Sequence, residues 1–295
     1  MRLLVTGADG QVGRALAALA VARGHEVIAL PRAALDVTAP RAVDGVLSDL
    51  ARPGLAVVNA AAYTAVDRAE AEPRRAFAVN RDGAGLLARG CARHGVPLVH
   101  LSTDYVFDGA RATAYTENAP VRPLGVYGES KAAGEAAVRD ALERHAIVRT
   151  AWVFSAHGAN FVRTVWRLAH ERDALRVVAD QWGHPTSARE VARGALAAAS
   201  RLVDGGERVG TVHWGGAPLA TWHALAEAVV EEAQRHGAAA GVRVEPIATA
   251  AYPTEARRPA RVELDMGRAA RVLGLAPAPW RPEVARVCAE LHGAA

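Results

Sequence analysis

The sequence predicts an α/β fold, a doubly wound parallel sheet with a second, smaller α/β domain. Short apolar runs recur from the N-terminus to about residue 150, and a helix-like segment follows most of them. The runs are apolar at nearly every position, as expected of strands that a parallel sheet buries on both faces. Strands that alternate with helices in this way are typical of sheets with helices on both sides. We therefore expect a first domain over residues 1–154 and a second domain over most of residues 155–295.

The individual elements follow from local patterns of apolar residues. Five strands are predicted for the first domain, over residues 2–7, 25–31, 55–62, 97–104 and 146–154. Its predicted helices span residues 12–22, 66–94 and 128–144. Beyond residue 155 the pattern loosens, and we expect a strand over 175–181, a helix over 188–202, a strand-like run at 211–216 and a helix over 222–236. The segment from about 175 to 202 is expected to return to the first domain.

Composition and charge favour a globular protein without a nucleic-acid partner. The chain has 295 residues, of which 51% are hydrophobic and 22% charged, enough for a sizeable core. Its formal net charge of +4 is spread along the chain without a block of like charges, so we predict no nucleic-acid binding. The acidic residues Asp67, Glu70 and Glu72 are expected to form the solvated start of a helix.

The sequence also predicts a cytoplasmic protein with no membrane segment. No apolar run reaches the ~18 residues of a membrane span, and the N-terminus lacks the apolar core of a signal peptide. Cys91 and Cys288 stand far apart, without a companion cysteine or histidine at metal-ligand spacing. We therefore expect neither a disulfide nor a metal site.

The segment GADGQVG, residues 7–13, directly follows the first strand and opens the first helix. Gly7 permits a tight turn, Gly10 lets the backbone approach a pyrophosphate, and Gly13 lets the helix pack closely on the sheet. The N-terminus of this helix offers unpaired N–H groups and a partial positive charge to phosphate groups. We therefore predict a Rossmann-type domain that binds a dinucleotide at this turn.

Residues at the ends of the second and third strands indicate which dinucleotide is bound. The second strand ends at Pro31 and Arg32, without the acidic residue that binds the ribose hydroxyls of NAD. Arg32 can instead pair with a 2′-phosphate, so we predict NADPH as the cofactor, with NADH as the alternative. Asp36 and Val37 fit a contact to the adenine. The small residues 59–62 let the backbone pass close to the cofactor.

Lys131 is the only lysine among the 35 basic residues, and it follows Tyr127 by four positions. On a helix, two such side chains lie on one face, one turn apart. A phenol with its ordinary pKa of ~10 is a poor acid–base catalyst at neutral pH, and a nearby ammonium group lowers that pKa. The ammonium group can also bind ribose hydroxyls, a task for which a flat guanidinium is poorly suited. In a chain that otherwise uses arginine, this lysine therefore indicates catalysis.

The fourth predicted strand ends at Ser102 and Thr103, at the sheet edge where open α/β folds bind their ligands. A hydroxyl there can donate to the same carbonyl oxygen that Tyr127 protonates. The next residue, Asp104, is expected to be ionised at pH 7, with an ordinary pKa of ~3.9, and therefore unable to donate a proton. A serine or threonine followed by Tyr-x-x-x-Lys is the pattern of short-chain dehydrogenases/reductases.

Longer motifs narrow this resemblance to one family. Nearly the whole chain resembles dTDP-4-dehydrorhamnose reductases, which are extended short-chain reductases. The matching segments are GADGQVG, LDVT, NAAAYTAVDRAE, LSTDYVFDG, VYGESKAAGE, VRTAWVF, GANFV, VADQWGHPTSA, TWH and AYPTEARRP. The resemblance implies an oxidoreductase of dTDP-rhamnose biosynthesis that reduces the 4-keto group of dTDP-4-dehydro-L-rhamnose with hydride from NAD(P)H.

The resemblance also implies roles for individual residues. The catalytic set would be Thr103, Tyr127 and Lys131. The deoxysugar would be bound by Thr103, Asp104, Tyr105 and Trp152. Besides Tyr127 and Lys131, the resemblance implies that Gly10, Gln11, Val12, Asp36, Val37, Ala62, Tyr63 and Thr64 hold the cofactor. Gly7, Gly13, Arg32 and Ala61, which belong to the turn and strand ends discussed above, complete the predicted cofactor site.

Departures from the family pattern leave some points open. Some members form a homodimer around magnesium bound by glutamates. Here Ala15 stands at one ligand position, although Glu190 matches another, so we predict no metal site and leave a homodimer open. Tyr63 stands where histidine is frequent, and Val262 stands where serine is usual, so the exact sugar is also open.

Three other functions remain as alternatives. A reductase or epimerase of another nucleotide-activated keto sugar would have the same general pattern. A dehydratase of this superfamily carries Asp-Glu directly after the threonine, whereas here Tyr105 follows Asp104. A non-catalytic regulatory subunit with the reductase fold need not keep Tyr127 and Lys131, so their presence favours an enzyme.

Overall fold

The computed structural model describes residues 1–205 and 208–294. The elements of the first half are β1 (Arg2–Thr6), α1 (Gln11–Ala22), β2 (Glu26–Leu30), α2 (Pro40–Leu50), β3 (Leu55–Asn59), α3 (Val66–Ala71), α4 (Pro73–Phe77), the π-helical turn η1 (Ala78–Gly83), α5 (Ala84–Arg93), β4 (Leu98–Thr103), the 3-10 turn η2 (Asp104–Val106), α6 (Val126–Ala141), β5 (His145–Thr150) and β6 (Val153–Phe154). The elements of the second half are α7 (Phe161–Ala169), β7 (Ala174–Val178), β8 (Trp182–Gly183), β9 (Thr186–Ser187), α8 (Ala188–Val203), β10 (Gly210–His213), β11 (Ala220–Thr221), α9 (Trp222–Arg235), β12 (Arg243–Ile247), the 3-10 turn η3 (Thr249–Ala251), α10 (Gly267–Leu273) and α11 (Trp280–Gly293).

The larger part of the molecule is a six-stranded sheet in the order β10-β5-β4-β3-β1-β2, and every neighbouring pair is parallel. The chain places β2 on one side of β1 and β3 on the other, so the strand order reverses at β1. Ligands of open α/β sheets bind at the carboxyl ends of the strands beside such a reversal. The predicted doubly wound parallel sheet is therefore confirmed.

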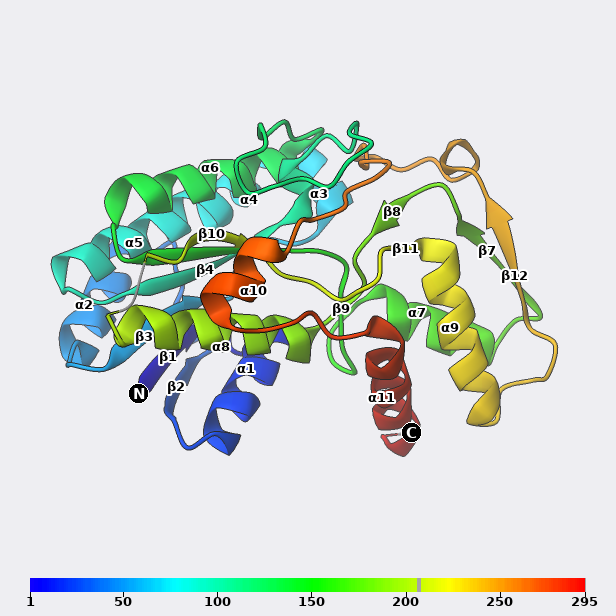
Figure 1. Ribbon diagram of the computed structural model, residues 1–295, viewed down its shortest axis with the longest axis horizontal. Helices are drawn as coiled ribbons and strands as arrows, with labels where there is room; N and C mark the ends of the chain where they lie inside the picture. The colour runs from blue at the N-terminus through cyan, green and yellow to red at the C-terminus, as the bar shows by residue number, and fades with distance from the viewer. Residues whose placement is uncertain (206–207, 295) are drawn as a thin grey trace.

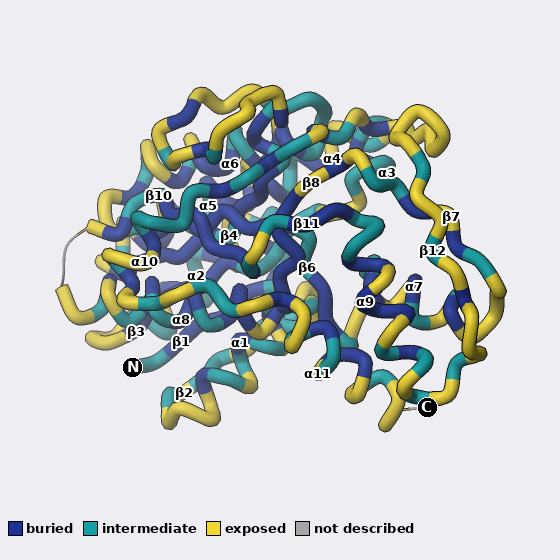
Figure 2. The backbone as a smooth tube through the Cα atoms, turned by 45° about the vertical axis from the view of Figure 1, so that its right-hand side comes forward, coloured by how far each residue is buried: buried dark blue, intermediate teal, exposed yellow. Residues whose placement is uncertain are grey.

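Helices cover both faces of the large sheet (Figure 1), and alternating residues of the strands pack on the two layers. Leu4, Val57 and Leu98 face α2, α5 and α6 in one apolar core. Leu3 and Val58 face α1 and α8 in the other. Figure 2 shows the inner strands, such as β3 and β4, among the most buried segments, whereas the edge strand β2 is partly exposed. The near-continuous apolar runs of the sequence thus reflect strands that are covered on both faces.

The smaller part of the molecule, on the right of Figure 1, is built from α7, α9, α11 and pairs of short strands. Its core gathers apolar side chains from the three helices and from β7. The strand pairs are β7 with β12, β8 with β11, and β6 with β9. This part lies against the carboxyl ends of the large sheet, so a cleft forms where the two parts meet.

The segment 175–202, which we expected to return to the first domain, divides between the two parts of the molecule. Helix α8 does pack on the large sheet, but β7 pairs with β12 in the smaller part. The burial of β7 explains the difference, because Leu175 and Val177 are buried whereas Arg176 between them is exposed. Such alternation indicates a strand covered on one face only. The sixth strand of the sheet is instead β10, which the sequence placed in the second domain.

Two further properties of the described residues complete the fold. No helix among them is long and apolar enough to cross a membrane. Cys91 and Cys288 are both buried free thiols, and burial raises the pKa of each to about 12. Both thiols therefore remain protonated and unreactive at neutral pH.

Candidate active site

The glycine turn joins the ends of β1 and β3 to the start of α1. Gly7 has a left-handed φ of 64°, and a Cβ there would lie 2.7 Å from Cα of Ala61. A Cβ at Gly13 would overlap the carbonyl oxygen of Gly7, so only glycine lets α1 pack this closely. At the helix start, Gly10 caps α1 without a side chain. The first N–H groups of α1 are therefore available to an anion such as a pyrophosphate.

A cleft of about 840 Å³ extends from this turn to the smaller part of the molecule. The predicted site residues that line it are Gly10, Gln11, Val12, Ala62, Thr64, Thr103, Asp104, Tyr105, Tyr127, Lys131 and Trp152. The other predicted cofactor residues do not line it; these are Gly7, Gly13, Arg32, Asp36, Val37, Ala61 and Tyr63. One cleft thus brings together the turn, the predicted catalytic set and the predicted sugar contacts.

Tyr127 and Lys131 lie on consecutive turns of α6, as the spacing predicts. Lys131 is only 2% exposed, and its Nζ donates to the Leu101 carbonyl oxygen at 2.6 Å. From the end of β4, the Thr103 hydroxyl donates to Asp104 Oδ1 at 3.1 Å. The Tyr105 ring meets that of Tyr127 edge-on, with 5.6 Å between the ring centres.

Burial shifts the pKa values of Tyr127 and Lys131 in opposite directions. It raises the pKa of the Tyr127 phenol to about 12, although a hydrogen bond with Thr103 lowers it in part. Burial also lowers the pKa of Lys131 to about 8. The expected lowering of the phenol pKa by Lys131 is therefore not found: desolvation of the phenolate raises this pKa, and the charge of Asp104 raises it further.

The expectation that Asp104 is an ordinary ionised carboxyl is wrong. The side chain is 2% exposed, and burial raises its pKa to about 7, against smaller opposing effects of hydrogen bonds from Thr103 and from backbone N–H groups. Asp104 therefore stays protonated at weakly acidic pH. Both Asp104 and Tyr127 can then hold a proton in the cleft.

Glu135 follows Lys131 by four residues, so it lies one turn further along the face of α6 that carries Tyr127 and Lys131. Its side chain is fully buried. Arg149 on β5 binds its carboxylate with two hydrogen bonds, of 2.8 and 2.7 Å. The Ser102 hydroxyl donates to the same carboxylate at 2.6 Å. This buried network fixes α6 on β4 and β5, and the charge of Glu135 raises the pKa of Lys131 against the effect of burial.

The acidic residues 67, 70 and 72 lie on or next to α3, as the sequence suggested, but they are held by specific contacts and are not simply solvated. Glu70 Oε1 accepts a hydrogen bond from Val126 N at 2.9 Å and so caps the N-terminus of α6. The carboxylate of Asp67 receives two hydrogen bonds from Arg258, of 2.7 and 3.0 Å, across the cleft. Asp67 and Glu70 were misread because their partners lie far away in the sequence, whereas Glu72 binds the nearby Arg68 and Arg75.

Gln11 and Tyr63 have contacts that fix the walls of the predicted cofactor site. Gln11 Oε1 accepts hydrogen bonds from Ser155 and Asn160, both at 3.0 Å, and so holds the segment before α7 against the glycine turn. The backbone N–H of Tyr63 donates to Asn80 Oδ1 at 2.8 Å, and its hydroxyl donates to Glu72 at 3.0 Å. These contacts order the segment that follows β3.

The predicted phosphate-binding residue, Arg32, lies at the surface just after β2. Its side chain is 65% exposed, and its guanidinium is 3.6 Å from Asp36. Asp36 accepts hydrogen bonds from the backbone and the hydroxyl of Thr38, at 2.9 and 2.7 Å, while Val37 is buried. Arg32 is thus held only loosely and can turn toward a ligand at the end of β2.

Comparisons with known proteins cover nearly the whole chain. The family model described as RmlD substrate binding domain matches residues 1–292. A dTDP-4-dehydrorhamnose reductase of Aggregatibacter actinomycetemcomitans is 42% identical over 283 residues, which are 95% of this chain and 96% of that one. The reductase of Sinorhizobium fredii is 43% identical over 293 residues, 97% of this chain and 96% of that one. The chain belongs to the dTDP-4-dehydrorhamnose reductase family.

Solved structures of this reductase family have the same fold over the full length. The Clostridium acetobutylicum reductase matches with a TM-score of 0.91 at 32% identity and covers 99% of both chains. The Bacillus anthracis reductase, solved in complex with NADP, matches with a TM-score of 0.88 at 31% identity, covering 98% of this chain and 99% of that one. The Thermus thermophilus UDP-glucose 4-epimerase, 22% identical with a TM-score of 0.80, shares the fold.

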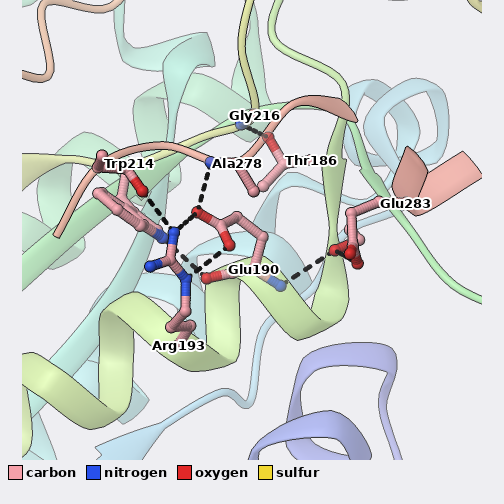
Figure 3. Close-up of polar contacts among 9 residues, drawn as sticks. Thr186, Glu190, Arg193, Trp214, Gly216, Ala278 and Glu283 are labelled. Atoms are coloured by element: carbon pink, nitrogen blue, oxygen red, sulfur yellow. Dashed lines mark hydrogen bonds and ion pairs between the residues drawn. The ribbon is translucent and has the colours of Figure 1, made fainter. Parts of the chain in front are cut away.

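The two positions that the resemblance to these reductases associates with magnesium do not fit a metal ion here. Both oxygens of Glu190 are bound by Arg193, at 2.7 and 2.9 Å, and Ala278 N donates to one of them at 3.1 Å (Figure 3). A guanidinium therefore already neutralises this carboxylate, and Ala15 supplies no ligand. No group of three or more metal-binding side chains occurs among residues 1–205 and 208–294.

Several residues that shape the cleft were not predicted. Glu135 could have been found, because it extends the four-residue spacing of Tyr127 and Lys131 along α6. Gln181, Trp222 and Arg258 line the cleft from the smaller part of the molecule. Their segments, DQWG, TWH and ARRP, matched the family, but the sequence did not show which side chain faces the cleft.

Proposed function

We propose that this reductase transfers hydride from NADPH to C4 of dTDP-4-dehydro-L-rhamnose and so forms dTDP-L-rhamnose. The cleft that joins the glycine turn, the Tyr127–Lys131 pair and the smaller part of the molecule is the observation that supports this proposal most strongly. In this cleft a dinucleotide and a nucleotide sugar can bind next to each other at the carboxyl ends of the strands. The relatives named above carry the same activity in their names, and one is bound to NADP.

We propose that Tyr127 donates the proton that the reduced sugar oxygen receives. When bound, NADPH supplies the hydride that adds to the carbonyl carbon. A phenol with a pKa of about 12 remains protonated at neutral pH, so it is ready to donate in the direction of reduction. Thr103 orients the carbonyl oxygen, and the Lys131 ammonium binds ribose hydroxyls and stabilises the phenolate that forms. Asp104 lies beside Thr103 and is the competing proton donor.

Loss of NADPH absorbance in the presence of dTDP-4-dehydro-L-rhamnose tests the reaction directly. Tyr127→Phe is expected to lower kcat about 100-fold or more while NADPH still binds, because only the proton donor is lost. Lys131→Arg should have a comparable effect, and Thr103→Val a smaller one. If Tyr127→Phe keeps normal turnover and Asp104→Asn abolishes it, the proton comes from the carboxyl.

We further propose that the large sheet binds the dinucleotide and the smaller part binds the nucleotide sugar, as the predicted domains imply. We propose a cytoplasmic location as well, because NADPH and dTDP-sugars are made there. A homodimer is the assembly that the resemblance suggests, and light scattering of the purified protein measures it. Gel-shift and vesicle-binding measurements should find neither a nucleic-acid nor a membrane partner.

A further inference from the structure

Trp152 has an unusual backbone conformation at the edge of the cleft. Its φ of 45° is the only left-handed value of a residue other than glycine among residues 1–205 and 208–294. Such a conformation is unfavourable for a bulky side chain and persists only where the surroundings fix it. Trp152 comes shortly after the end of β5 and lines the same cleft as Thr103, Tyr127 and Lys131. The fold therefore holds an indole at this place against a local backbone preference.

Two contacts fix this indole, one from Gly183 on β8 and one from Trp222 at the start of α9. The Trp222 indole stacks on that of Trp152, with 3.6 Å between the ring centres and 8° between the planes. Gly183 lies so close to Trp152 that a Cβ there would be 2.5 Å from its Cε2 atom. The antiparallel pairing of β8 with β11 sets Gly183 opposite Ala220, two residues before Trp222. The pairing of β8 with β11 thus places Gly183 and Trp222 next to Trp152 at the same time.

Trp222 is itself anchored by a chain of hydrogen bonds that runs from the buried Gln181 to exposed residues at the surface. Its Nε1 donates to Gln181 Oε1 at 3.2 Å, and the Gln181 amide is buried. Gln181 Nε2 donates to the Thr249 hydroxyl at 3.1 Å. That hydroxyl donates to Asp180 at 2.6 Å. The orientation of the Trp222 ring is therefore set by hydrogen bonds as well as by packing, and its one polar group is already used.

We propose that Trp222 is a positioning residue of this reductase. With Gly183, it holds the indole of Trp152 rigidly at the sugar side of the cleft, so that the substrate meets a preformed apolar wall beside the catalytic groups. The assignment rests on the proposed function. A preformed wall reduces the cost of ordering the site when substrate binds. Loss of Trp222 should therefore weaken sugar binding and turnover while cofactor binding is unchanged.

Trp222→Ala and a matched control separate this role from general packing. Trp166 on α7 is also a half-buried tryptophan of the same apolar core, but it packs against His170 and His236 and is absent from the cleft lining. We expect Trp222→Ala to raise the KM for dTDP-4-dehydro-L-rhamnose about tenfold or more and to lower kcat, the pattern of lost substrate positioning. Its Kd for NADPH should stay within about twofold of the wild-type value. Trp166→Ala should change neither kinetic constant.

A second variant reaches the same indole by another route. Gly183→Ala leaves Trp222 in place but forces a methyl group against Trp152, so it should reproduce the rise in sugar KM. Circular dichroism provides a readout without substrate, because stacked indoles give an exciton couplet that Trp152→Phe and Trp222→Phe should each remove, and Trp166→Phe should not. Retention of the couplet in Trp222→Phe would overturn the proposed stacking.

The kinetic outcomes also distinguish this proposal from the function on which it rests. A sugar KM that stays within about twofold of wild type in both Trp222→Ala and Gly183→Ala would overturn the positioning role. An equal rise in Trp166→Ala would reduce the effect to core packing and would also overturn it. If the wild-type protein fails to oxidise NADPH with the dTDP-sugar, the proposed function fails, whereas the dichroism still reports on the indole pair.

Discussion

At the scale of single residues, the buried carboxyl of Asp104 makes stability depend on pH in a defined direction. Its pKa in the folded protein is about 7, whereas an unfolded aspartate titrates near ~3.9. Between these values the folded protein binds a proton that the unfolded chain has lost. The stability that protonated Asp104 contributes is therefore fully present below the pKa of the unfolded chain. It is lost as the pH rises through the pKa of the folded protein.

Asp104→Asn should remove this dependence, because an amide does not ionise. We expect the melting temperature of the variant, relative to wild type, to rise between pH 5 and pH 8 by roughly 5 °C. Thermal unfolding at a series of pH values measures this difference. Asp140→Asn, which alters an exposed carboxyl on α6, serves as the control. A difference between Asp104→Asn and wild type that is constant with pH would contradict the raised pKa.

The exposed guanidinium of Arg32 makes a prediction about cofactor choice. Its single ion pair with Asp36 is long, at 3.6 Å, and lies at the surface, so little holds the side chain away from a 2′-phosphate. Arg32→Ala should raise the KM for NADPH about tenfold or more and barely change the KM for NADH. Arg41→Ala, which removes another exposed arginine nearby in sequence, should affect neither. Equal effects of Arg32→Ala on both cofactors would show that Arg32 does not bind the phosphate.

The sequence carried enough information to bring Thr103, Tyr127 and Lys131 to one place, because strand ends and four-residue helical spacing are local rules. It could not show the pKa values of these groups and of Asp104. Those values depend on how deeply each side chain is buried, and burial is set by packing between segments distant in the chain. The ordinary pKa assumed for Asp104 failed for this reason.

At the scale of elements, helix α6 carries both Tyr127 and Lys131, and its N-terminus has an unusual cap. The N-cap residue, Gly125, has no side chain, and Glu70 from α3 binds the N–H of Val126 instead. The position of Tyr127, in the first turn, therefore depends on a contact between two elements. A carboxylate at this end also interacts favourably with the helix dipole.

Glu70→Ala should weaken this end of α6. We expect a loss of stability of about 1 kcal/mol, as for other lost N-caps, together with a several-fold fall in kcat because Tyr127 is less well ordered. Chemical unfolding and steady-state kinetics measure the two effects. Glu129→Ala alters an exposed acid in the same turn without removing a cap. If the two variants behave alike, Glu70 has no special role.

Elements with strongly apolar patterns were predicted well, and others were missed for physical reasons. Strand β3 is buried at all five positions, so its sequence pattern was clear. Helix α2 buries only Val43 and Leu47 and contains Gly45, so its pattern was too weak to recognise. The single helix predicted over 66–94 is interrupted at Pro73, where a new helix begins. The partner of β7 could not be predicted, because pairing depends on strands far apart in the sequence.

At the scale of the whole molecule, Asp67 and Arg258 join the two sides of the cleft. Asp67 lies on α3 beside the large sheet, and Arg258 lies in the segment between η3 and α10 that lines the cleft. Their ion pair has two short hydrogen bonds but is partly exposed. Such pairs contribute about 1 kcal/mol or less to stability. The pair therefore has more effect on the geometry of the cleft than on folding.

Asp67→Asn should raise the KM for the sugar nucleotide several-fold, leave the Kd for NADPH unchanged and shift the melting temperature by less than about 3 °C. Arg258→Gln should have at least the same effect, since Arg258 also faces the cleft. The double variant should show less than the sum of the single effects, because both remove one interaction. Additive changes in sugar KM would show that the two residues act independently.

The late position of β10 in the chain has a consequence for synthesis on the ribosome. Strand β5 lacks a neighbour on one edge until residues 210–213 have emerged, and α8, which covers one face of the sheet, also comes after residue 187. A nascent chain that ends near residue 154 therefore has a complete cofactor turn but an open strand edge and an apolar face that α1 covers and α8 does not yet cover. Open edges and uncovered faces favour pairing with other chains. We therefore expect a nascent chain of this length to associate with other chains more readily than the finished protein does.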